Sequence, residues 1–300
     1  MEDKQRVHIV PIVIFNSQKL KLAIPKGMLY NKIVELLSDI GLELSQNGRN
    51  YRPFINDAEL EVKILKPQVI SKLVENGSQD IGFCGYDWII EQNARVKELL
   101  DTQMDKVKII SAIPKEYNFD KLIKRKIRIA SEYETIAKKY LEEKQINYEF
   151  IKTYGATEVY PPEDADMIID NTSTGKTIKD NNLKIIQTLM YSSTRFIANI
   201  DALKNKWKMQ KINNILMLIK SVLEARSRVL IEMNIAQNKL LEIIPYLPCM
   251  KSPTISKLYG ESGYAVKIAV KRQEVNKLIP ILKAKGATDI LEYKLEKVVE

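Results

Sequence analysis

Residues 59–91, ELEVKILKPQVISKLVENGSQDIGFCGYDWIIE, alternate between two kinds of apolar pattern. The run 59–66 is short and continuous, as in a strand, whereas 67–77 has the spacing of a helix, with proline in its first turn and glycine after its end. Residues 80–91 repeat this order with a strand, a turn at Gly85 and the start of another helix. Repeated βα units of this kind predict predominantly parallel sheets covered by helices.

The same alternation continues on both sides of this stretch. LKLAIP (20–25) runs through the turn Pro25-Lys26-Gly27 into a segment with helical spacing that stops at Gly41. Further strands are expected at 108–114, 126–131, 147–153 and 165–170, with a helix that ends near Lys144. In open α/β sheets, ligands bind beyond the carboxyl ends of the strands, so the turns that follow these strands are candidates for a site.

The last part of the chain has a different pattern. Residues 225–300 follow the order β-α-β-β-α-β, which is the split βαβ order of a ferredoxin-like module. A segment with helical spacing, from about Ala202 to Glu224, precedes this module and is expected to join it to the rest of the protein.

The charge of the chain raises the possibility of a nucleic-acid-binding protein. The 300 residues contain 47 Lys and Arg against 38 Asp and Glu, a formal charge of +9. Residues 1–200 hold 29 basic and 28 acidic side chains, whereas 201–300 hold 18 and 10, so the excess lies in the last hundred residues. A solvated basic face explains this excess, and we expect no nucleic-acid partner.

Other classes are excluded by composition. A hydrophobic content of 45% is too high for a disordered chain, and no apolar run reaches the roughly 18 residues that span a bilayer. Cys84 and Cys249 cannot form a disulfide scaffold, and the apolar stretch 7–15 lacks the features of a signal peptide. We therefore expect a cytoplasmic protein that binds no membrane. Because His8 is the sole histidine, catalysis through a histidine triad is excluded.

The segment 165–182, ADMIIDNTSTGKTIKDNN, is the richest in chemistry. An apolar strand ends at Asp170, and a turn of small, hydroxyl-bearing and basic residues precedes a short predicted helix: Thr172, Ser173, Thr174, Gly175, Lys176 and Thr177. Backbone amides, a glycine and hydroxyl donors suit a phosphate group. A nucleotide P-loop needs glycine at position 170, whereas aspartate suits a ribose diol or a developing positive charge. The pattern favours a sugar phosphate, and an ordinary polar loop is the alternative.

Two other turns carry cations. Lys26 and Gly27 follow the first strand and could meet a phosphate or a base, or form an ordinary βα turn with a solvated lysine. Arg49 and Arg52 flank Tyr51 in NGRNYRP (47–53), a set that can bind phosphate and stack on a purine. Exposed arginines beside tyrosine are also common on protein surfaces.

Two acidic residues are further candidates. Glu158 lies in a glycine-led turn within 155–166, where a solvated acid is the alternative. Asp87 follows the Gly85 turn, where it could bind a ligand or cap the helix. Cys84 ends a strand pattern and is expected to be a packing residue, because no histidine is available to activate it.

Together these strings resemble one family, the long form of ATP phosphoribosyltransferase of histidine biosynthesis. The resemblance covers residues 20–300 and rests on strings that occur in the same order along the chain: LKLAIPKG, RNYRP, LKPQVISKLVENGSQDIGFCGYDWI, YGATEVYPPEDADMIIDNTSTGKT, MKSPTISKLYG and GATDILEY. Each string alone is moderately specific, and their order and spacing make chance an unconvincing explanation.

The resemblance implies a fold of class α/β with three parts. A catalytic region built like type II periplasmic binding proteins would consist of lobe I, residues 1–108 with 189–224 returning to it, and lobe II, residues 109–188. Residues 225–300 would form a ferredoxin-like, ACT-like regulatory domain that binds histidine. Homo-oligomers from dimer to hexamer are implied as well.

The reaction implied by the resemblance is that of a pentosyltransferase. It joins N1 of ATP to C1 of the ribose of phosphoribosyl pyrophosphate and releases phosphoribosyl-ATP and pyrophosphate, with Mg²⁺ present on ligands that the sequence does not identify. This is the first step of histidine biosynthesis, with feedback inhibition by histidine. A catalytically silent two-lobed protein that binds a ligand or senses an amino acid is the alternative.

The resemblance also assigns roles to residues. The turn from Ser173 to Thr177 would hold the ribose 5-phosphate, and Asp170 and Glu158 would face the ribose hydroxyls or Mg²⁺ as catalytic residues. The residues expected to bind phosphoribosyl pyrophosphate are Asp170, Thr172, Ser173, Thr174, Gly175, Lys176 and Thr177. Those expected to bind ATP or the leaving pyrophosphate are Lys26, Gly27, Arg49, Arg52, Gly85 and Asp87. Ser252 and Thr254 match the histidine-binding string.

Overall fold

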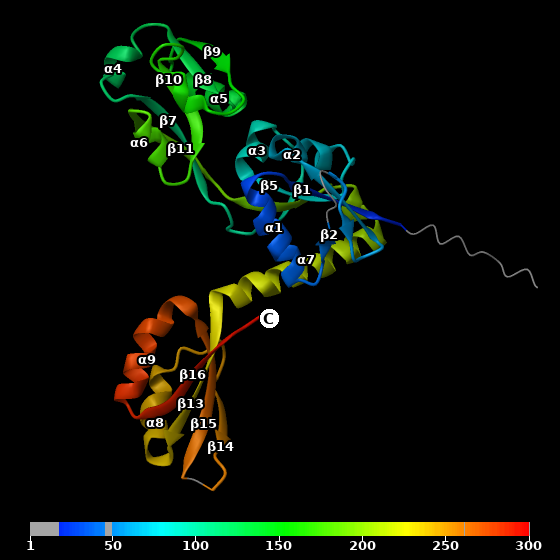
Figure 1. The fold of residues 1–300 in the computed structure, drawn as a ribbon, viewed down its shortest axis with the longest axis vertical. Helices are drawn as coiled ribbons and strands as arrows, with labels where there is room; N and C mark the ends of the chain where they lie inside the picture. The colour runs from blue at the N-terminus through cyan, green and yellow to red at the C-terminus, as the bar shows by residue number, and fades with distance from the viewer. Residues whose placement is uncertain (1–17, 46–49, 261, 300) are drawn as a thin grey trace, which may run out of the picture.

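The computed structural model describes residues 18–45, 50–260 and 262–299, which form two α/β lobes and a C-terminal domain (Figure 1). Each lobe contains a five-stranded sheet, and the C-terminal domain contains a sheet of four strands. The long helix α7, Lys206–Ser227, lies along the first lobe and leads into the C-terminal domain. Among these described segments no helix is long and apolar enough to cross a membrane.

The first lobe has the strand order β4-β1-β5-β12-β6. Its strands are β1 Leu20–Pro25, β4 Leu60–Leu65, β5 Ile81–Gly85, β6 Lys97–Asp101 and β12 Thr194–Ala198. Its helices are α1 Met28–Asp39, α2 Pro67–Glu75 and α3 Tyr86–Glu91, and a small ladder joins β2 Leu44–Ser45 to β3 Phe54–Ile55. The strand, turn and helix order expected for 59–91 is confirmed.

The second lobe has the strand order β11-β7-β10-β8-β9. Its strands are β7 Val107–Pro114, β8 Ile127–Ser131, β9 Tyr148–Lys152, β10 Met167–Thr172 and β11 Leu183–Ser192. Its helices are α4 Phe119–Leu122, α5 Glu134–Glu143 and α6 Lys176–Asp180, with a 3-10 turn, η1, at Thr157–Val159.

The prediction of predominantly parallel sheets is wrong for half of the pairings. In the first lobe β1 pairs parallel with β4 and β5, but β12 runs antiparallel to β5 and β6. In the second lobe β7 runs antiparallel to β10 and β11, while β8 pairs parallel with β9 and β10. The chain crosses between the lobes twice, after β6 and after β11, and the first strand after each crossing, β7 and then β12, runs opposite to the other strands of its sheet. Apolar spacing carries no information on that direction.

The C-terminal domain has the predicted ferredoxin-like order, with its strands paired antiparallel as β14-β15-β13-β16. Its elements are β13 Arg228–Ala236, α8 Leu240–Ile243, β14 Thr254–Lys257, β15 Gly263–Lys271, α9 Val275–Ala284 and β16 Ala287–Lys294. The helix predicted from Ala202 is divided at Asn205, because Ala202–Lys204 forms a 3-10 turn and the Asn205 side chain caps α7 by accepting from the Lys208 N–H.

Each part has its own apolar core. In the first lobe, Phe83 and Phe196 pack with ring centroids 4.8 Å apart, and α7 adds Ile212, Ile215 and Ile219 to the same cluster. The α7 helix is therefore part of the first lobe by packing, although it follows both lobes in the sequence. The second lobe and the C-terminal domain bury separate clusters.

Candidate functional site

The hydroxyl-rich turn predicted to bind phosphate joins β10 to α6. Gly175 has a φ of 78°, a left-handed conformation that favours glycine. The Thr172 Oγ1 accepts a hydrogen bond of 3.0 Å from the Gly175 N–H, and Thr174 Oγ1 accepts one of 3.3 Å from the Lys176 N–H. The threonine side chains thus shape the turn around its glycine.

This turn lines a cavity of about 420 Å³ between the lobes. The residues lining it are Met28, Asp105, Val107, Glu132, Gly155, Ala156, Thr157, Glu158, Asp170, Asn171, Thr172, Ser173, Thr174, Thr177 and Ile178. Six predicted residues meet here: Asp170, Glu158, Thr172, Ser173, Thr174 and Thr177. Gly175 and Lys176 lie in the same turn but outside the lining. The acidic residues of the lining, called the acidic wall below, are Asp105, Glu132, Glu158 and Asp170, and the hydroxyl groups of the turn line the same cavity.

The acidic wall changes the ionisation of Asp170. Burial, together with the carboxylates of Glu158 and Glu132, raises the pKa of Asp170 to about 6, although hydrogen bonds from the Asn171 N–H and the Thr157 hydroxyl oppose the rise. The Asn171 N–H donates to Asp170 Oδ1 at 2.7 Å. Asp170 is therefore a carboxylate at neutral pH that becomes protonated only slightly below it.

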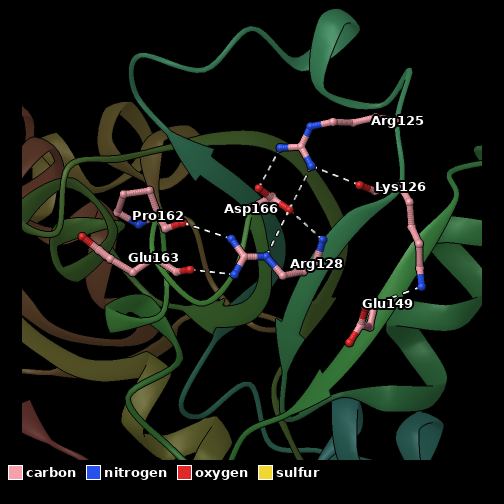
Figure 2. Close-up of polar contacts among 7 residues, drawn as sticks. All are labelled: Arg125, Lys126, Arg128, Glu149, Pro162, Glu163 and Asp166. Atoms are coloured by element: carbon pink, nitrogen blue, oxygen red, sulfur yellow. Dashed lines mark hydrogen bonds and ion pairs between the residues drawn. The ribbon is translucent and has the colours of Figure 1, made fainter.

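The loop that carries Glu158 is fixed to the second lobe by an ion-pair network (Figure 2). Asp166 Oδ1 accepts from the Arg125 guanidinium at 2.9 Å, and Asp166 Oδ2 accepts from the Arg128 N–H at 2.8 Å. The Arg128 guanidinium in turn donates to the backbone carbonyl groups of Pro162 and Glu163.

The same network lowers the pKa of Asp166. Its burial acts in the opposite direction, but the hydrogen bond and charge of Arg125, together with the bonds and charge of Arg128, prevail. At its other end, the loop is bound by a 2.9 Å hydrogen bond between the hydroxyl groups of Thr153 and Thr157. Glu158 is thus held on an anchored turn rather than on a free loop.

Two more cavities adjoin the first one in the cleft. One, of about 510 Å³, is lined by Lys26, Gly27, Lys66, Pro67, Gln68, Trp88, Gln92, Glu132, Lys152, Thr153 and Tyr154. The other, of about 170 Å³, is lined by Lys26, Met28, Leu29, Pro67, Gly85, Asp87, Trp88, Asp105, Val107, Tyr133, Asn171, Ser192 and Thr194. Shared lining residues connect the three cavities. The larger of the two brings lysines from both lobes together beside the acidic wall.

The sequence of this chain is similar to those of known proteins. The model of the family described as ATP phosphoribosyltransferase matches residues 66–221, and the model of its C-terminal domain matches residues 225–297. The chain is 39% identical to the ATP phosphoribosyltransferase of Thermodesulfovibrio yellowstonii, over 93% of this chain and 98% of that protein. It is 38% identical to that of Pelotomaculum thermopropionicum, over 94% of this chain and 99% of that protein.

The chain belongs to the ATP phosphoribosyltransferase family. Among solved structures, the ATP phosphoribosyl transferase (HisG:HisZ) complex from Thermotoga maritima matches with a TM-score of 0.60 and 25% identity, covering 67% of this chain and 98% of that chain. The resemblance inferred from the motifs is therefore confirmed. So is the fold class, a two-lobed α/β region followed by a C-terminal domain.

The residues predicted to bind ATP are distributed over different parts of the cleft and beyond it. Lys26 and Gly27 line the 510 Å³ cavity. Arg52 forms an ion pair with Glu61 at 2.5 Å on an exposed surface and lines none of the three cavities. Arg49 lies outside the described residues. The assignment of both arginines to ATP stays a prediction.

Asp87 is engaged by protein groups. Its Oδ1 accepts from the Ser192 hydroxyl at 2.6 Å and its Oδ2 accepts from the Tyr133 hydroxyl at 2.8 Å, so Asp87 does not cap α3. A Cβ atom added to Gly85 would lie 2.1 Å from Asp87 Oδ1. Gly85 is therefore needed for the close approach of this carboxylate to the backbone.

The sequence reasoning missed several residues of the cleft: Lys66, Glu132, Tyr133, Lys152, Asn171 and Ser192. Glu132 and Tyr133 directly follow β8, so the rule that located Asp170 at the end of β10 could have found them. The role of Ser192 could not be found in this way, because its partner Asp87 is 105 residues away in the sequence.

Ser252 and Thr254, predicted to bind histidine, lie together at the edge of the C-terminal sheet. Thr254 begins β14, pairs with Lys267 of β15 and is exposed, as is Ser252. Their assignment to histidine stays a prediction.

Proposed function

We propose that this chain transfers the phosphoribosyl group of phosphoribosyl pyrophosphate to N1 of ATP, forming phosphoribosyl-ATP and pyrophosphate. The observation that carries the proposal is the meeting of Asp170 and the hydroxyl-rich turn in one 420 Å³ cavity between the lobes. The alternative, a silent ligand-binding or sensor protein, gives no reason for carboxylates and a hydroxyl-rich turn in the same cavity.

The surroundings of the cavity suit the charge that develops during this transfer. Departure of pyrophosphate leaves positive charge on C1 and the ring oxygen of the ribose, and a carboxylate nearby stabilises that charge. Asp170 and Glu158 supply carboxylates, while the Ser173 to Thr177 turn would bind the 5-phosphate. N1 of ATP is already a nucleophile, so positioning replaces a general base.

The lysines of the 510 Å³ cavity suit the polyphosphate groups. Lys26 and Lys66 come from the first lobe and Lys152 from the second, where the Lys152 Nζ donates to the Glu132 carbonyl oxygen at 2.9 Å. Cations near phosphate oxygens stabilise both bound ATP and leaving pyrophosphate. Gly27 would line this cavity for ATP, and Gly85 and Asp87 would line the adjoining 170 Å³ cavity.

Mg²⁺ fits the site if protein and substrate each supply some of its ligands. No group of three or more acidic, histidine or cysteine side chains among the residues described could hold a metal alone. Mg²⁺ commonly binds one or two carboxylates together with substrate phosphates, and Asp170 and Glu158 are the acids available for that arrangement. When bound, Mg²⁺ would neutralise charge on the leaving pyrophosphate.

Regulation by histidine, a cytoplasmic location and assembly into dimers or hexamers are further parts of the proposal. The match of residues 225–297 to the family's C-terminal domain supports the first, with Ser252 and Thr254 as the histidine contacts. The α7 helix offers a route for coupling, because it packs in the first lobe and leads directly into β13.

The test is an assay of pyrophosphate release by the purified protein. ATP, phosphoribosyl pyrophosphate and Mg²⁺ are mixed with the protein, with and without histidine, and each substrate is omitted in turn. Release that needs both substrates supports the transferase. No release under these conditions contradicts it and favours the silent sensor, whereas release that histidine does not change contradicts only the regulatory part.

A further inference from the structure

Helix α3 of the first lobe is hydrogen-bonded to the N-terminus of helix α5 of the second lobe. The α5 helix has no side-chain cap from its own N-terminal residues. Instead, the buried Glu91 of α3 accepts hydrogen bonds of 3.1 Å from the N–H groups of both Thr135 and Ile136. A carboxylate at a helix N-terminus stabilises the helix, so the first lobe supplies the N-terminal cap of α5 in the second lobe.

Tyr133 lies at the centre of this contact. Its side chain is 1% exposed and its ring stacks on Trp88 of α3 with centroids 4.8 Å apart. Its hydroxyl donates to Asp87 Oδ2 at 2.8 Å and accepts from the Asn171 Nδ2 at 3.0 Å. One hydroxyl thus joins α3 of the first lobe to the end of β10 in the second.

The chain of bonds continues in both directions. On one side, Asp87 is held by the Ser192 hydroxyl, and the Asp87 N–H also donates to Ser192 Oγ at 3.0 Å, beside the crossing from β11 to β12. On the other side, the Asn171 N–H donates to Asp170 Oδ1 at 2.7 Å. Every bond is within the ordinary range for a hydrogen bond, so hydrogen bonds connect Ser192, beside the crossing from β11 to β12, to Asp170 of the acidic wall.

We propose that Tyr133 is a positioning residue that fixes Asn171, and through it Asp170, against the first lobe. This inference rests on the proposed function, because it assigns Asp170 to the transfer step. Tyr133 needs no contact with substrate for this role. Burial and the nearby Asp87 carboxylate raise the pKa of the Tyr133 hydroxyl, so it keeps its proton and remains a donor to Asp87.

Loss of the hydroxyl should act on orientation rather than on binding. In Tyr133→Phe the ring can still stack on Trp88, but Asp87 loses a donor and the Asn171 amide loses its acceptor. The lobes then lose the polar connection that aligns Asp170 with the reacting carbon. A small misplacement of reacting groups costs rate steeply, whereas the cavities that bind the substrates keep their walls.

The experiment compares Tyr133→Phe with Tyr140→Phe. Tyr140 is also a buried tyrosine of the second lobe, and its hydroxyl accepts from Ser111 Oγ at 3.3 Å away from the cleft, so both variants remove one buried hydroxyl group. We expect Tyr133→Phe to lower kcat about tenfold or more with KM for both substrates changed less than about threefold. We expect Tyr140→Phe to change kcat less than about twofold. Equal kcat values for the two variants would overturn the proposal.

A second readout does not depend on transferase activity. Amide hydrogen exchange of the two variants and the wild type is followed at residues 134–137 and 170–172. We expect about tenfold faster exchange at both segments in Tyr133→Phe only. Unchanged exchange at 170–172 would contradict the positioning role even in a protein that released no pyrophosphate, and the lack of release would by itself contradict only the proposed function.

A double substitution tests whether Tyr133 acts through Asn171. If the two residues work through their shared bond, Tyr133→Phe combined with Asn171→Ala should lower kcat no more than about twofold beyond the more damaging single variant. Multiplication of the two single effects would show that Tyr133 acts independently of Asn171 and would overturn the proposed route.

Discussion

Strand β10, Met167–Thr172, has one aspartate directly before it and another in its second half, and the two side chains have opposite surroundings. Asp166 precedes the strand and lies against two arginines, which hold the pKa of its carboxyl below the usual range. Asp170 lies near the other end beside Glu158 and Glu132, and burial with these carboxylates raises its pKa to about 6. The same residue type is satisfied by cations before the strand, whereas burial and charges of its own sign leave it poised near the other end, as we propose for a residue that takes part in the transfer.

The largest effect that this contrast predicts is on turnover. Asp170→Asn keeps the shape of the side chain but removes the negative charge, so kcat should fall about a hundredfold or more. Stability at neutral pH should rise by about 2 kcal/mol, because a buried negative charge and its repulsion from Glu158 and Glu132 are removed. Pyrophosphate release and urea unfolding of the same preparation measure the two effects. An unchanged rate would show that Asp170 is not the acid that the transfer uses.

Substitution of Asp166, at the start of the strand, should lower stability and leave turnover nearly unchanged. Asp166→Asn weakens the bonds to Arg125 and to the Arg128 N–H, which should lower the free energy of unfolding by about 2 kcal/mol. The kcat of the folded fraction should fall less than about threefold. Urea unfolding measures the loss. Wild-type stability in this variant would show that the network in Figure 2 does not hold the loop.

The two aspartates should also give stability an opposite dependence on pH. The raised pKa of Asp170 means that the folded state binds its proton more tightly, so its contribution to stability falls by about 2 kcal/mol as pH rises from its ordinary value of 3.8 to about 6. The lowered pKa of Asp166 has the reverse sign, and its contribution is lost as pH falls below 3.8.

Urea unfolding between about pH 2.5 and 7 can separate the two contributions. From pH 4 to 6, wild type should lose stability relative to Asp170→Asn. Below pH 4, it should lose its advantage over Asp166→Asn. Parallel pH curves for all three proteins would show that the two environments do not differ in this way.

The smallest effect concerns the acid limb of the rate profile. For the wild type, kcat/KM should fall below a midpoint near pH 6 as Asp170 becomes protonated. Glu132→Gln removes one of the neighbouring negative charges, so the midpoint should move to lower pH by a fraction of a unit. Glu149→Gln, an exposed acid paired with Lys126, is the control and should leave the midpoint in place.

The sequence pointed to Asp170 but not to the ion pairs of Asp166. The position of Asp170 in the cleft could be predicted because a strand, an acid near its end and the following hydroxyl-rich turn are adjacent in the chain. Asp166 lies in the same segment, but its role depends on Arg125, which precedes β8, and on Arg128, which lies on β8. A linear pattern shows where a strand ends, but it does not show which charges another strand brings alongside.

The same limit explains the missed contacts between the lobes, whereas the missed strand β11 has a local cause. Tyr133 and Asp87 are 46 residues apart, and Asp87 and Ser192 are 105 residues apart, so only the folded crossings bring them together. The strand β11 was not predicted because irregularities between Ile185 and Gln187 and between Thr188 and Met190 interrupt the alternation that marks a strand.

The most direct test of the central claim compares the two ends of β10 in one assay. Pyrophosphate release from ATP and phosphoribosyl pyrophosphate is measured side by side for wild type, Asp170→Asn and Asp166→Asn, each corrected for its folded fraction. We predict that kcat of Asp170→Asn is at least about thirtyfold below that of Asp166→Asn. Equal rates for the two variants would contradict the assignment of Asp170 to the transfer and of Asp166 to the fold.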